Sequence, residues 1–351
     1  MSRIIYIPEF IELISSNLSD KDKLSFVSCN KLINDNKFLL KFDNMYNYNK
    51  IKNNWRLHRV AKLHIDSSVH SALYVGLPFN VIYLKIFLYF TESILNSPLN
   101  LTHLSLEHDF NYQIDNLPQY LTHLTLGHNF NQRIDNLPKS LTHLTLGFNF
   151  NQRIDNLPSS LTHLTLGFDF NRRIDNLPKS LTHLFLDFCF NQEINNLPSS
   201  LTHLIIAHYS NFNQQINNIP KSLTHLALGQ DFNQQIDNLP ESLTHLTLGH
   251  CFNQQIDNLP KSLTHLILGE RFNQQIDNLP KSLIQLTLGY CFNQQIDNLP
   301  KSLIKLTLGY SFNREINNLP RGLKYLNVYY NFDQEINNFP EGLIFHRYRY
   351  T

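Results

Sequence analysis

A histidine recurs along the middle of the chain every twenty residues, with one two-residue insertion around Tyr209 and Ser210. Each of these histidines stands in a Leu-Thr-His-Leu segment, whose alternation of apolar and polar residues is typical of a short strand. Imidazoles on neighbouring strands about 4.8 Å apart could share a zinc ion, so this column is the first candidate for chemistry. Its members are His103, His123, His143, His163, His183, His203, His225, His245 and His265.

The surroundings of the column do not favour a metal centre. No acidic residue or cysteine stands beside the histidines, although zinc sites use carboxylates to orient their ligands. The column also continues as Gln285, Lys305 and Tyr325 without a break in the repeat. We therefore predict no metal and no cofactor, and interpret the column as flat rings stacked on an exposed sheet. Mutual repulsion should lower the pKa of these histidines.

Serine, histidine and aspartate all recur, so a hydrolytic triad can be assembled on paper from any unit. Nothing distinguishes one serine from the others, and the chain contains neither a Gly-x-Ser-x-Gly turn nor a glycine-rich phosphate loop. The recurring aspartate comes late in the unit and should lie across the coil from the strand. The sequence therefore predicts no catalytic site and no enzyme.

The elements that position these residues are copies of one unit, such as 121–140. A fixed period of this size is the signature of a solenoid, in which each coil buries its apolar side against its neighbours. With positions numbered from the first leucine, the strand covers positions 3 to 6, with its leucines inward and its histidine and threonine outward. Copies of the strand should pair in parallel and in register. The sequence thus predicts a repeat solenoid with a parallel β-sheet face.

The remaining positions of the unit form the rest of the coil. Phe130, Ile134 and Leu137 should fill the interior. Gly127 is expected to allow a sharp departure from the strand, and Pro138 to fix the closing turn. Asparagine recurs at positions 11 and 16, and we predict that at least one of these columns is an internal ladder that pairs buried backbone groups of adjacent coils.

The unit Leu-x-x-Leu-x-Leu-x-x-x-Phe-Asn-x-x-Ile-x-x-Leu-Pro-x-Ser resembles a leucine-rich repeat. Its Phe-Asn, Ile and Pro positions resemble more closely the FNIP repeats of social amoebae and giant DNA viruses. The resemblance covers residues 99–340, about twelve units, and implies a leucine-rich-repeat-like solenoid. A degenerate capping repeat, with Leu84 and Ile86 inward and Tyr83 and Lys85 outward, and a linker should occupy 61–98. A C-terminal cap should occupy 341–351.

Residues 1–60 follow a different pattern, with apolar residues at helical spacing. Three short helices are expected, the third around Phe38 to Phe42. The order of residues in this segment resembles an F-box, which docks on the Skp1 adaptor of a cullin-type ubiquitin ligase. A helical cap that only covers the end of the solenoid is the alternative. By the resemblance, the Skp1 contacts would be Ile7, Pro8, Leu18, Leu24 and Val27.

Positions that vary between units are the best clue to a binding surface. Positions 8 and 9 lie just past the strand, at the rim of the sheet, and carry aromatic residues in successive units. Exposed aromatic residues are typical of protein interfaces, although the rings could also merely pack on one another. The predicted partner-binding surface comprises His123, His143, His163, Phe148, Phe168, Phe188, Tyr290, Tyr310 and Tyr330.

Composition adds bounds on partners and location. The net charge is +1, which gives no indication of binding to nucleic acid or to an acidic membrane surface. Neither a signal peptide nor a long apolar run is apparent. Cys251 and Cys291 stand two units apart, roughly 10 Å, too far for a disulfide, so reduced thiols are expected. We expect a monomeric protein of the cytoplasm, or of the host cytoplasm if the chain is viral.

These patterns together predict a substrate-recognition adaptor of a cullin-type ubiquitin ligase. Its F-box would dock on a Skp1-like adaptor, and its solenoid would bind a target protein that the sequence does not identify. The alternative is a protein-interaction scaffold with no role in ubiquitination.

Overall fold

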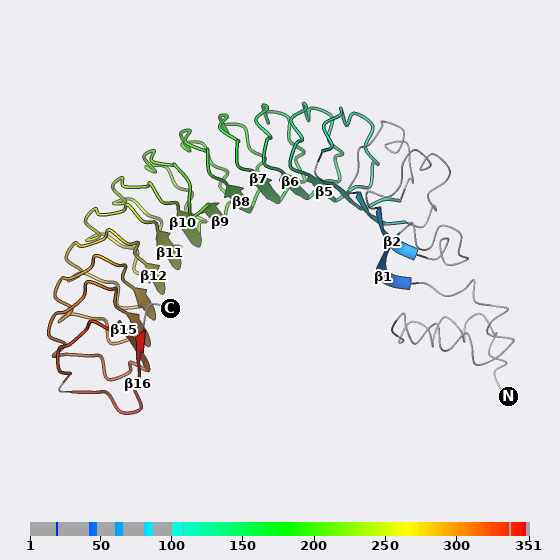
Figure 1. Cartoon of the computed structure of the whole chain (residues 1–351). Coiled ribbons are helices and arrows are strands. Elements are labelled where there is room, and N and C mark those ends of the chain that lie inside the picture. The colour runs from blue at the N-terminus through cyan, green and yellow to red at the C-terminus, as the bar shows by residue number, and fades with distance from the viewer. Residues whose placement is uncertain are drawn as a thin grey trace, which may run out of the picture. The chain divides into compact units, whose positions relative to one another are not determined.

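The computed structural model describes Ser19 and residues 42–47, 60–65, 81–86, 100–107, 109–336 and 338–348. The chain divides into two units, Met1–Gly147 and Phe148–Thr351. Each unit is a stack of coils, and each coil contributes one short strand (Figure 1). No helix within these described ranges is long and apolar enough to cross a bilayer.

The first unit contains strands that pair in parallel and in chain order. The register places equivalent residues side by side, so that His103 lies opposite His123 and Leu104 opposite Leu124. The degenerate repeat forms a strand with Leu84 and Ile86 buried, but it does not cap the sheet, because strands pair with it on both sides. The strands are β1 (Phe42–Asn47), β2 (Val60–Ile65), β3 (Tyr83–Ile86), β4 (His103–Leu106), β5 (His123–Leu126) and β6 (His143–Leu146).

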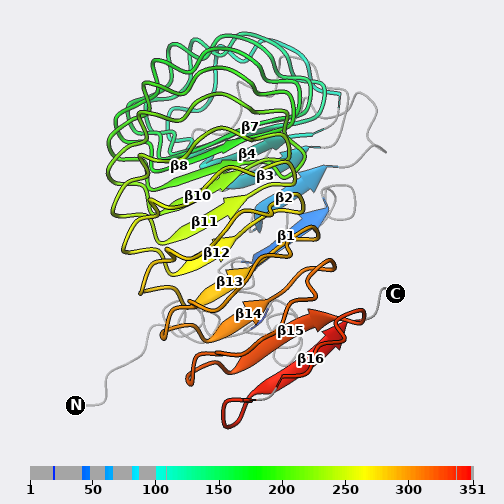
Figure 2. The ribbon, with the colours of Figure 1, turned by 90° about the vertical axis from the view of Figure 1, so that its left-hand side faces the viewer.

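The second unit repeats this arrangement over ten strands, again parallel and in chain order. Figure 2 shows β10 to β16 side by side in chain order, and in Figure 1 the strands lie along one side of the coils. They are β7 (His163–Leu166), β8 (His183–Leu186), β9 (His203–Ile206), β10 (His225–Leu228), β11 (His245–Leu248), β12 (His265–Ile267), β13 (Gln285–Thr287), β14 (Lys305–Thr307), β15 (Tyr325–Tyr329) and β16 (Ile344–Tyr348).

The core is a set of apolar columns, as the periodicity predicts. The strand leucines are buried and the residues between them are not, so most strands alternate along their length. Behind the strands, a column of phenylalanines is almost completely buried, with successive rings nearly parallel and 6.0–6.2 Å apart. Truncating a ring such as Phe252 to alanine would cost about 3–5 kcal/mol, because the rigid coils above and below cannot close the cavity.

The sheet begins earlier in the chain than the sequence reading predicts. Phe42, assigned to the end of a third helix, instead begins β1, and the predicted linker contains β2. The signal was present: Leu63 and Ile65 pair with Leu84 and Ile86, so the same alternation occurs one coil earlier. Parallel pairing with an existing strand outweighs weak local helical spacing at this point. The residues predicted to contact Skp1, Ile7, Pro8, Leu18, Leu24 and Val27, lie outside the described residues.

The closing turn of each coil is built by its proline and serine. Leu141 N–H donates to the carbonyl oxygen of Pro138 at 3.1 Å, which closes a four-residue turn. The serine that follows the proline by two residues then donates to the carbonyl of the leucine that begins its own coil. Ser140 Oγ lies 2.7 Å from Leu121 O, and Ser302 Oγ lies 2.6 Å from Leu283 O. One hydroxyl thus ties the end of a coil to its beginning, except where Tyr120, Gly322 or Gly342 replaces the serine.

The asparagine at position 11 forms the predicted ladder. The backbone N–H of Asn293 donates to Oδ1 of Asn273 at 2.9 Å, and the Gln294 amide donates to the same oxygen at 3.2 Å. The same bond links the equivalent residues of neighbouring coils down to Asp333. The ladder is half-buried rather than internal, because the loop that carries it forms the edge of the coil. The asparagines at position 16 are exposed.

The glycine column has a different cause from the one predicted. Among the described glycines, only Gly342 has a φ in the left-handed region, at 73°. A Cβ added to Gly289 would instead overlap the backbone carbonyl of Gly269 and lie 2.7 Å from Cα of Glu270. Equivalent overlaps occur at Gly147, Gly249 and Gly309. At these coils glycine is needed because the neighbouring backbones approach too closely for a side chain, whereas Glu107, Asp187, Ala207 and Tyr329 occupy position 7 in other coils.

The last coil ends the core as the predicted cap does. β16 pairs with β15 over five residues, but its side chains are exposed except for the half-buried Phe345. Arg347 takes the place of a core leucine, and its guanidinium lies 5.7 Å from the centre of the Phe345 ring. Polar and aromatic residues therefore cover the final layer of leucines.

The glycine contact predicts that Gly289→Ala destabilises the solenoid by about 2–3 kcal/mol, because the methyl group overlaps backbone atoms that cannot rotate away. Gly322→Ala is the matched control. Its Cβ would have a nearest neighbour 3.6 Å away, so its stability should be unchanged or slightly raised. Urea unfolding of the two variants and the parent measures the difference. Equal losses in both variants would contradict the explanation.

The ladder predicts that Asn273→Ala lowers the free energy of unfolding by about 1 kcal/mol or more, because two donors on the next coil lose their acceptor. Asn278→Ala makes the same change at position 16. That side chain is exposed and bonds only Asp257, at 3.2 Å, so its loss should stay within about 0.5 kcal/mol. Denaturation midpoints that fall equally in both variants would argue against the ladder.

Candidate functional site: the outer face of the sheet and its rim

The histidine column forms a continuous stack on the outer face of each unit. In the first unit, the rings of His103, His123 and His143 stack with centres 4.1 Å apart, and Tyr83 extends the stack at 5.5 Å. In the second unit, successive rings from His163 to His265 lie 4.1–4.2 Å apart with planes within 13° of one another. The rings are half-exposed. The predicted outward stack is therefore confirmed in both units.

A threonine holds each ring in place. Thr224 Oγ1 lies 3.1 Å from the carbonyl oxygen of Thr202 on the preceding coil and 2.9 Å from Nδ1 of His225. The hydroxyl therefore contacts both the preceding coil and the ring, and it fixes the orientation of the ring through Nδ1. Whether Nδ1–H donates to the hydroxyl or the hydroxyl donates to Nδ1 is set by the tautomer of the ring. The same geometry recurs along the column.

This bond explains a feature of the sequence that periodicity alone does not. Every histidine of the column follows a threonine, and each unit that lacks the threonine also lacks the histidine. The exceptions are Ile82-Tyr83, Ile284-Gln285, Ile304-Lys305 and Lys324-Tyr325. The two positions change together because the hydroxyl both bridges the coils and fixes the ring. This joint change is the sequence feature that could have placed the threonines in the candidate site, from which they were missing.

Burial and neighbouring charges act on the histidines in the same direction. Burial is the larger cause that lowers the pKa of His183, His203 and His245, and repulsion from the adjacent histidines lowers it further. The pKa of His103 is also lowered, first by burial and then by His143 and Lys62. The predicted direction is therefore confirmed for these four histidines, but its main cause is partial burial in the stack rather than repulsion.

The stack is a poor metal site. Because the rings are nearly parallel, their Nε2 atoms point side by side instead of converging on one ion, as tetrahedral zinc requires. Among the described side chains, no group of three or more His, Cys, Asp or Glu residues is arranged to hold a metal. The face offers a row of ring nitrogens and apolar ring edges, which suits contact with another macromolecule.

The aromatic residues at the rim form two short stacks in the second unit. The rings of Phe148, Phe168 and Phe188 are parallel, with centres 4.2 Å and 4.5 Å apart. Phe148 is 38% exposed and the other two are half-buried. The rings pack on one another, which is one of the two interpretations of these residues. Their edges are nevertheless exposed. Whether a partner contacts them stays a prediction.

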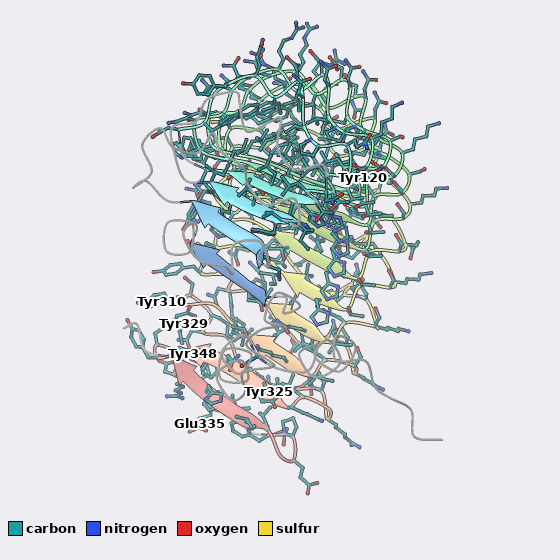
Figure 3. All side chains as sticks on the ribbon, turned by 90° about the vertical axis from the view of Figure 1, so that its right-hand side faces the viewer. Tyr120, Tyr310, Tyr325, Tyr329, Glu335 and Tyr348 are labelled. Carbon is teal, nitrogen blue, oxygen red and sulfur yellow. The ribbon has the colours of Figure 1, made fainter. Side chains whose placement is uncertain are left out.

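The second rim stack is made of tyrosines near the C-terminal coils. Tyr290 and Tyr310 stack at 4.7 Å, whereas Tyr330 turns edge-on at 5.8 Å with its hydroxyl 3.3 Å from that of Tyr310. Tyr310, Tyr329 and Tyr348 follow one another in Figure 3, with ring centres 6.1 Å and 6.3 Å apart. Side chains with an apolar body and a polar tip thus cluster at this end of the sheet.

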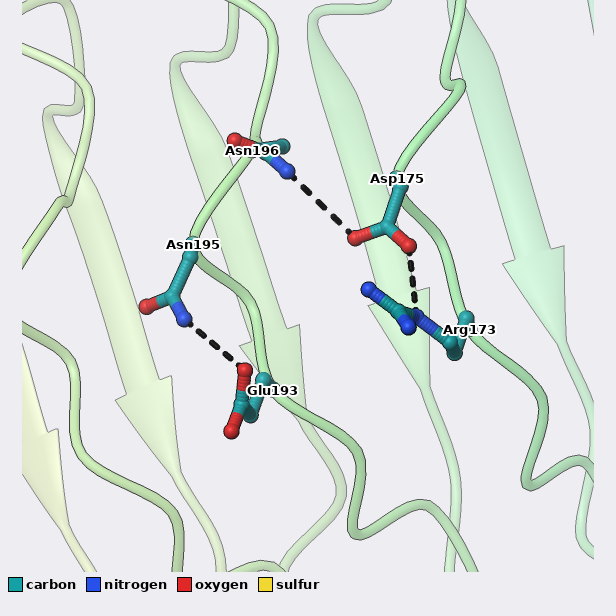
Figure 4. A network of polar contacts seen from close by, with 5 residues as sticks. All are labelled: Arg173, Asp175, Glu193, Asn195 and Asn196. Carbon is teal, nitrogen blue, oxygen red and sulfur yellow. Dashed lines mark hydrogen bonds and ion pairs between the residues drawn. The ribbon is translucent and has the colours of Figure 1, made fainter.

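The back of the coils carries a separate polar network that is structural. Figure 4 shows Arg173 paired with Asp175 at 2.7 Å, and the Asn196 amide reaching the same carboxylate from the next coil. The Asn195 amide donates to Glu193 at 3.0 Å. These carboxylates lie on loops in front of the strands in that view, so the recurring aspartates do not join the histidines in a triad. They link coils on the surface.

The cysteine column lies beside the rim. Cys189, Cys251 and Cys291 are free thiols, the first two half-buried. Burial raises the pKa of the Cys189 thiol, and the nearby Asp169 and Asp187 raise it further. A raised pKa disfavours the reactive thiolate, so this cysteine has the environment of a packing residue rather than of a nucleophile.

The lowered pKa values predict that the protein loses stability as pH falls. A histidine whose folded pKa lies below its unfolded value stabilises the fold above about pH 6.5, and this contribution is lost as pH falls through the lowered pKa. The melting temperature should therefore drop between about pH 7 and pH 5. The triple variant His183→Gln, His203→Gln, His245→Gln should show a smaller drop. Glutamine is chosen because Gln285 occupies the same position in the repeat.

The control for this experiment is His208→Gln, an exposed histidine outside the column. It should keep the pH profile of the parent, which calorimetric melts at several pH values would record. Identical profiles for the parent and the triple variant would show that the column does not control the acid sensitivity.

The comparisons agree with this geometry. The FNIP Repeat family matches residues 113–149, 150–189, 190–231, 212–251, 252–291 and 292–318. No curated protein sequence matches the chain. Among solved structures, CroV588, described as a novel circular leucine-rich-repeat protein, is 38% identical with a TM-score of 0.66. The match covers 82% of this chain but 53% of that one, so the chain spans about half the length of CroV588.

Two further structures share the fold at low identity. YopM from Yersinia enterocolitica WA-314 is 23% identical, with a TM-score of 0.55 and coverage of 83% of this chain and 64% of its own. The functional domain of InlJ from Listeria monocytogenes is 14% identical, with a TM-score of 0.50 and coverage of 76% and 66%. The coils, their asparagine ladder and these matches together show that the chain belongs to the FNIP repeat family and has a leucine-rich-repeat-like solenoid fold.

Proposed function

We propose that this protein is the substrate-recognition adaptor of a cullin-type ubiquitin ligase, in which the solenoid binds a target protein and the N-terminal region docks on a Skp1-like subunit. The coarser part of this function, protein–protein interaction, follows from the fold, since repeat solenoids present extended surfaces and typically act as non-enzymatic scaffolds. The ubiquitin role is the finer step. Such a protein would work in the cytoplasm, as a monomer outside the ligase assembly.

The observation that carries target binding is the exposed aromatic surface on a rigid frame. Phe148, Phe168 and Phe188 are held at fixed spacing by their own stacking and by coils that are hydrogen-bonded throughout. Immobilised aromatic side chains lose little conformational entropy when they bind, so they contribute strongly to interfaces. The histidine stack beside them adds a row of polar ring nitrogens. A partner would thus meet a preformed surface.

The support for Skp1 docking comes from the sequence alone. Ile7-Pro8-Glu9, the helical spacing up to Leu18, and the segment from Leu24 through Val27 follow the order of an F-box. The parallel sheet is already present at β1, so such a module would lie before Phe42.

The Skp1 prediction is tested with the full-length protein and purified Skp1. The variant Leu18→Asp, Leu24→Asp should lose binding at least about 100-fold, because two apolar contacts are replaced by charges that would be buried without partners. Ile284→Asp, at an exposed isoleucine of the solenoid, is the matched control and should bind like the parent. Isothermal titration calorimetry gives the affinities.

The outcomes separate the adaptor from its alternative. Tight binding by the parent and by Ile284→Asp, with loss in the N-terminal double variant, supports the adaptor. If the folded parent does not bind Skp1 at all, the ubiquitin role is excluded and the protein is an interaction scaffold.

A further inference from the structure

The threonine column at position 5 is interrupted in the middle of the second unit. Thr165, Thr287 and Thr307 keep the residue typical of the repeat. Between them, β8, β9, β10 and β12 instead carry Phe185, Ile205, Ala227 and Ile267. This position points outward from the sheet, and Ile205 and Ile267 are 39% and 38% exposed. Exchanging a threonine hydroxyl for apolar surface at solvent does not stabilise the coil, so the change calls for another explanation.

These substitutions create a hollow on the sheet face with a volume of about 360 Å³. Phe185 and Ile205 form one wall and Ile267 the other. The floor is low because Ala227 has only a methyl group, and because the glycines at position 7 expose backbone beside it. A hollow of this size lies at the lower end of the range for binding sites. Since the wall side chains reach solvent, it is open along its length.

The rim of the hollow is polar and acidic on one side. Glu270 is 61% exposed along its side chain and lies 3.0 Å from Nδ1 of His250, both at position 8. On the other side lies His208, next to the two-residue insertion. The insertion buries Ser210 and leaves Tyr209 69% exposed. Insertions in repeat proteins commonly map to the binding face, and this one lies beside the hollow.

We propose that this hollow binds an extended segment of a target protein, with bulky apolar side chains at two alternate positions and a lysine or arginine following them. The hollow crosses the sheet from β8 to β12, roughly 19 Å at about 4.8 Å per strand. About six residues of extended chain span that length at about 3.3 Å each. Alternate side chains of the segment enter the hollow, and its cationic residue meets Glu270. This inference rests on target binding by the solenoid.

The probe is an array of fluorescein-labelled eight-residue peptides, measured by polarisation with the full-length protein. Leucine, isoleucine, methionine or phenylalanine occupies the two alternate positions, lysine or glutamate follows, and serine fills the rest. Peptides with lysine should bind, and their glutamate counterparts should bind about tenfold more weakly, because the charge opposite Glu270 is reversed. Failure of every peptide to bind, or equal binding of both charge forms, would overturn the proposal.

Two variants locate the binding. The triple variant Phe185→Thr, Ile205→Thr, Ile267→Thr restores the repeat's own residue and should weaken binding at least about tenfold without unfolding the coils. Ala227→Phe fills the hollow and should have the same effect. Ile284→Thr, an exposed isoleucine elsewhere that also becomes threonine, is the matched control and should bind like the parent. Equal affinities in all four proteins would place the peptide elsewhere and refute the site.

Sedimentation velocity of the free protein tests another occupant. If the hollow were covered by a second copy of the chain, the parent would dimerise and Ala227→Phe would not, which would overturn the peptide proposal. The outcomes are independent of the ubiquitin role, since the peptide experiment contains no Skp1. Peptide binding without Skp1 binding would refute the adaptor function alone. Skp1 binding without peptide binding would refute the peptide site in the hollow alone.

Discussion

The distance between parallel hydrogen-bonded strands, about 4.8 Å, is the constraint on which the rest of each unit depends. One strand per coil fixes the rise of the coil, and every other side chain must then repeat at that rise. Flat histidine rings can meet it almost directly, at 4.1–4.2 Å between centres. The phenylalanines instead offset to 6.0–6.2 Å inside the core. At glycines such as Gly289 the same rise brings backbone against backbone and leaves no room for a Cβ.

The same constraint explains how much was readable from the sequence. Strands, inward leucines, the buried phenylalanines and the outward histidines follow from period and alternation, because each column has one environment throughout. The reason for Gly289 did not, since overlap with a carbonyl of the next coil depends on the actual separation of two backbones. β2 was missed because its core residues Leu63 and Ile65 lie one coil before the repeats recognised in the sequence, where the motif has degenerated. β1 lies one coil earlier still.

The candidate site was likewise only partly predictable from the sequence. The stack and its rim were predictable as surfaces, since period two places position 3 outward and position 8 just past the strand. The double contact of the Thr224 hydroxyl, with the ring of His225 and with the carbonyl of the previous coil, was not, because it depends on how closely neighbouring coils approach. The loss of threonine at Ala227 is visible in the sequence. That this loss produces a hollow could not be predicted, because the hollow also depends on the outward face of the sheet and on the neighbouring glycines.

The asparagine ladder has a consequence for how such chains change. Each coil offers an Oδ1 acceptor on one side and an N–H donor on the other, so its two faces are complementary to those of any other coil. Duplication or deletion of a whole unit therefore preserves this asparagine hydrogen bond between the coils that become neighbours. Outward residues at positions 5 and 8 can then be reshuffled between copies, so a new recognition surface can arise by rearranging existing modules without redesigning the interior.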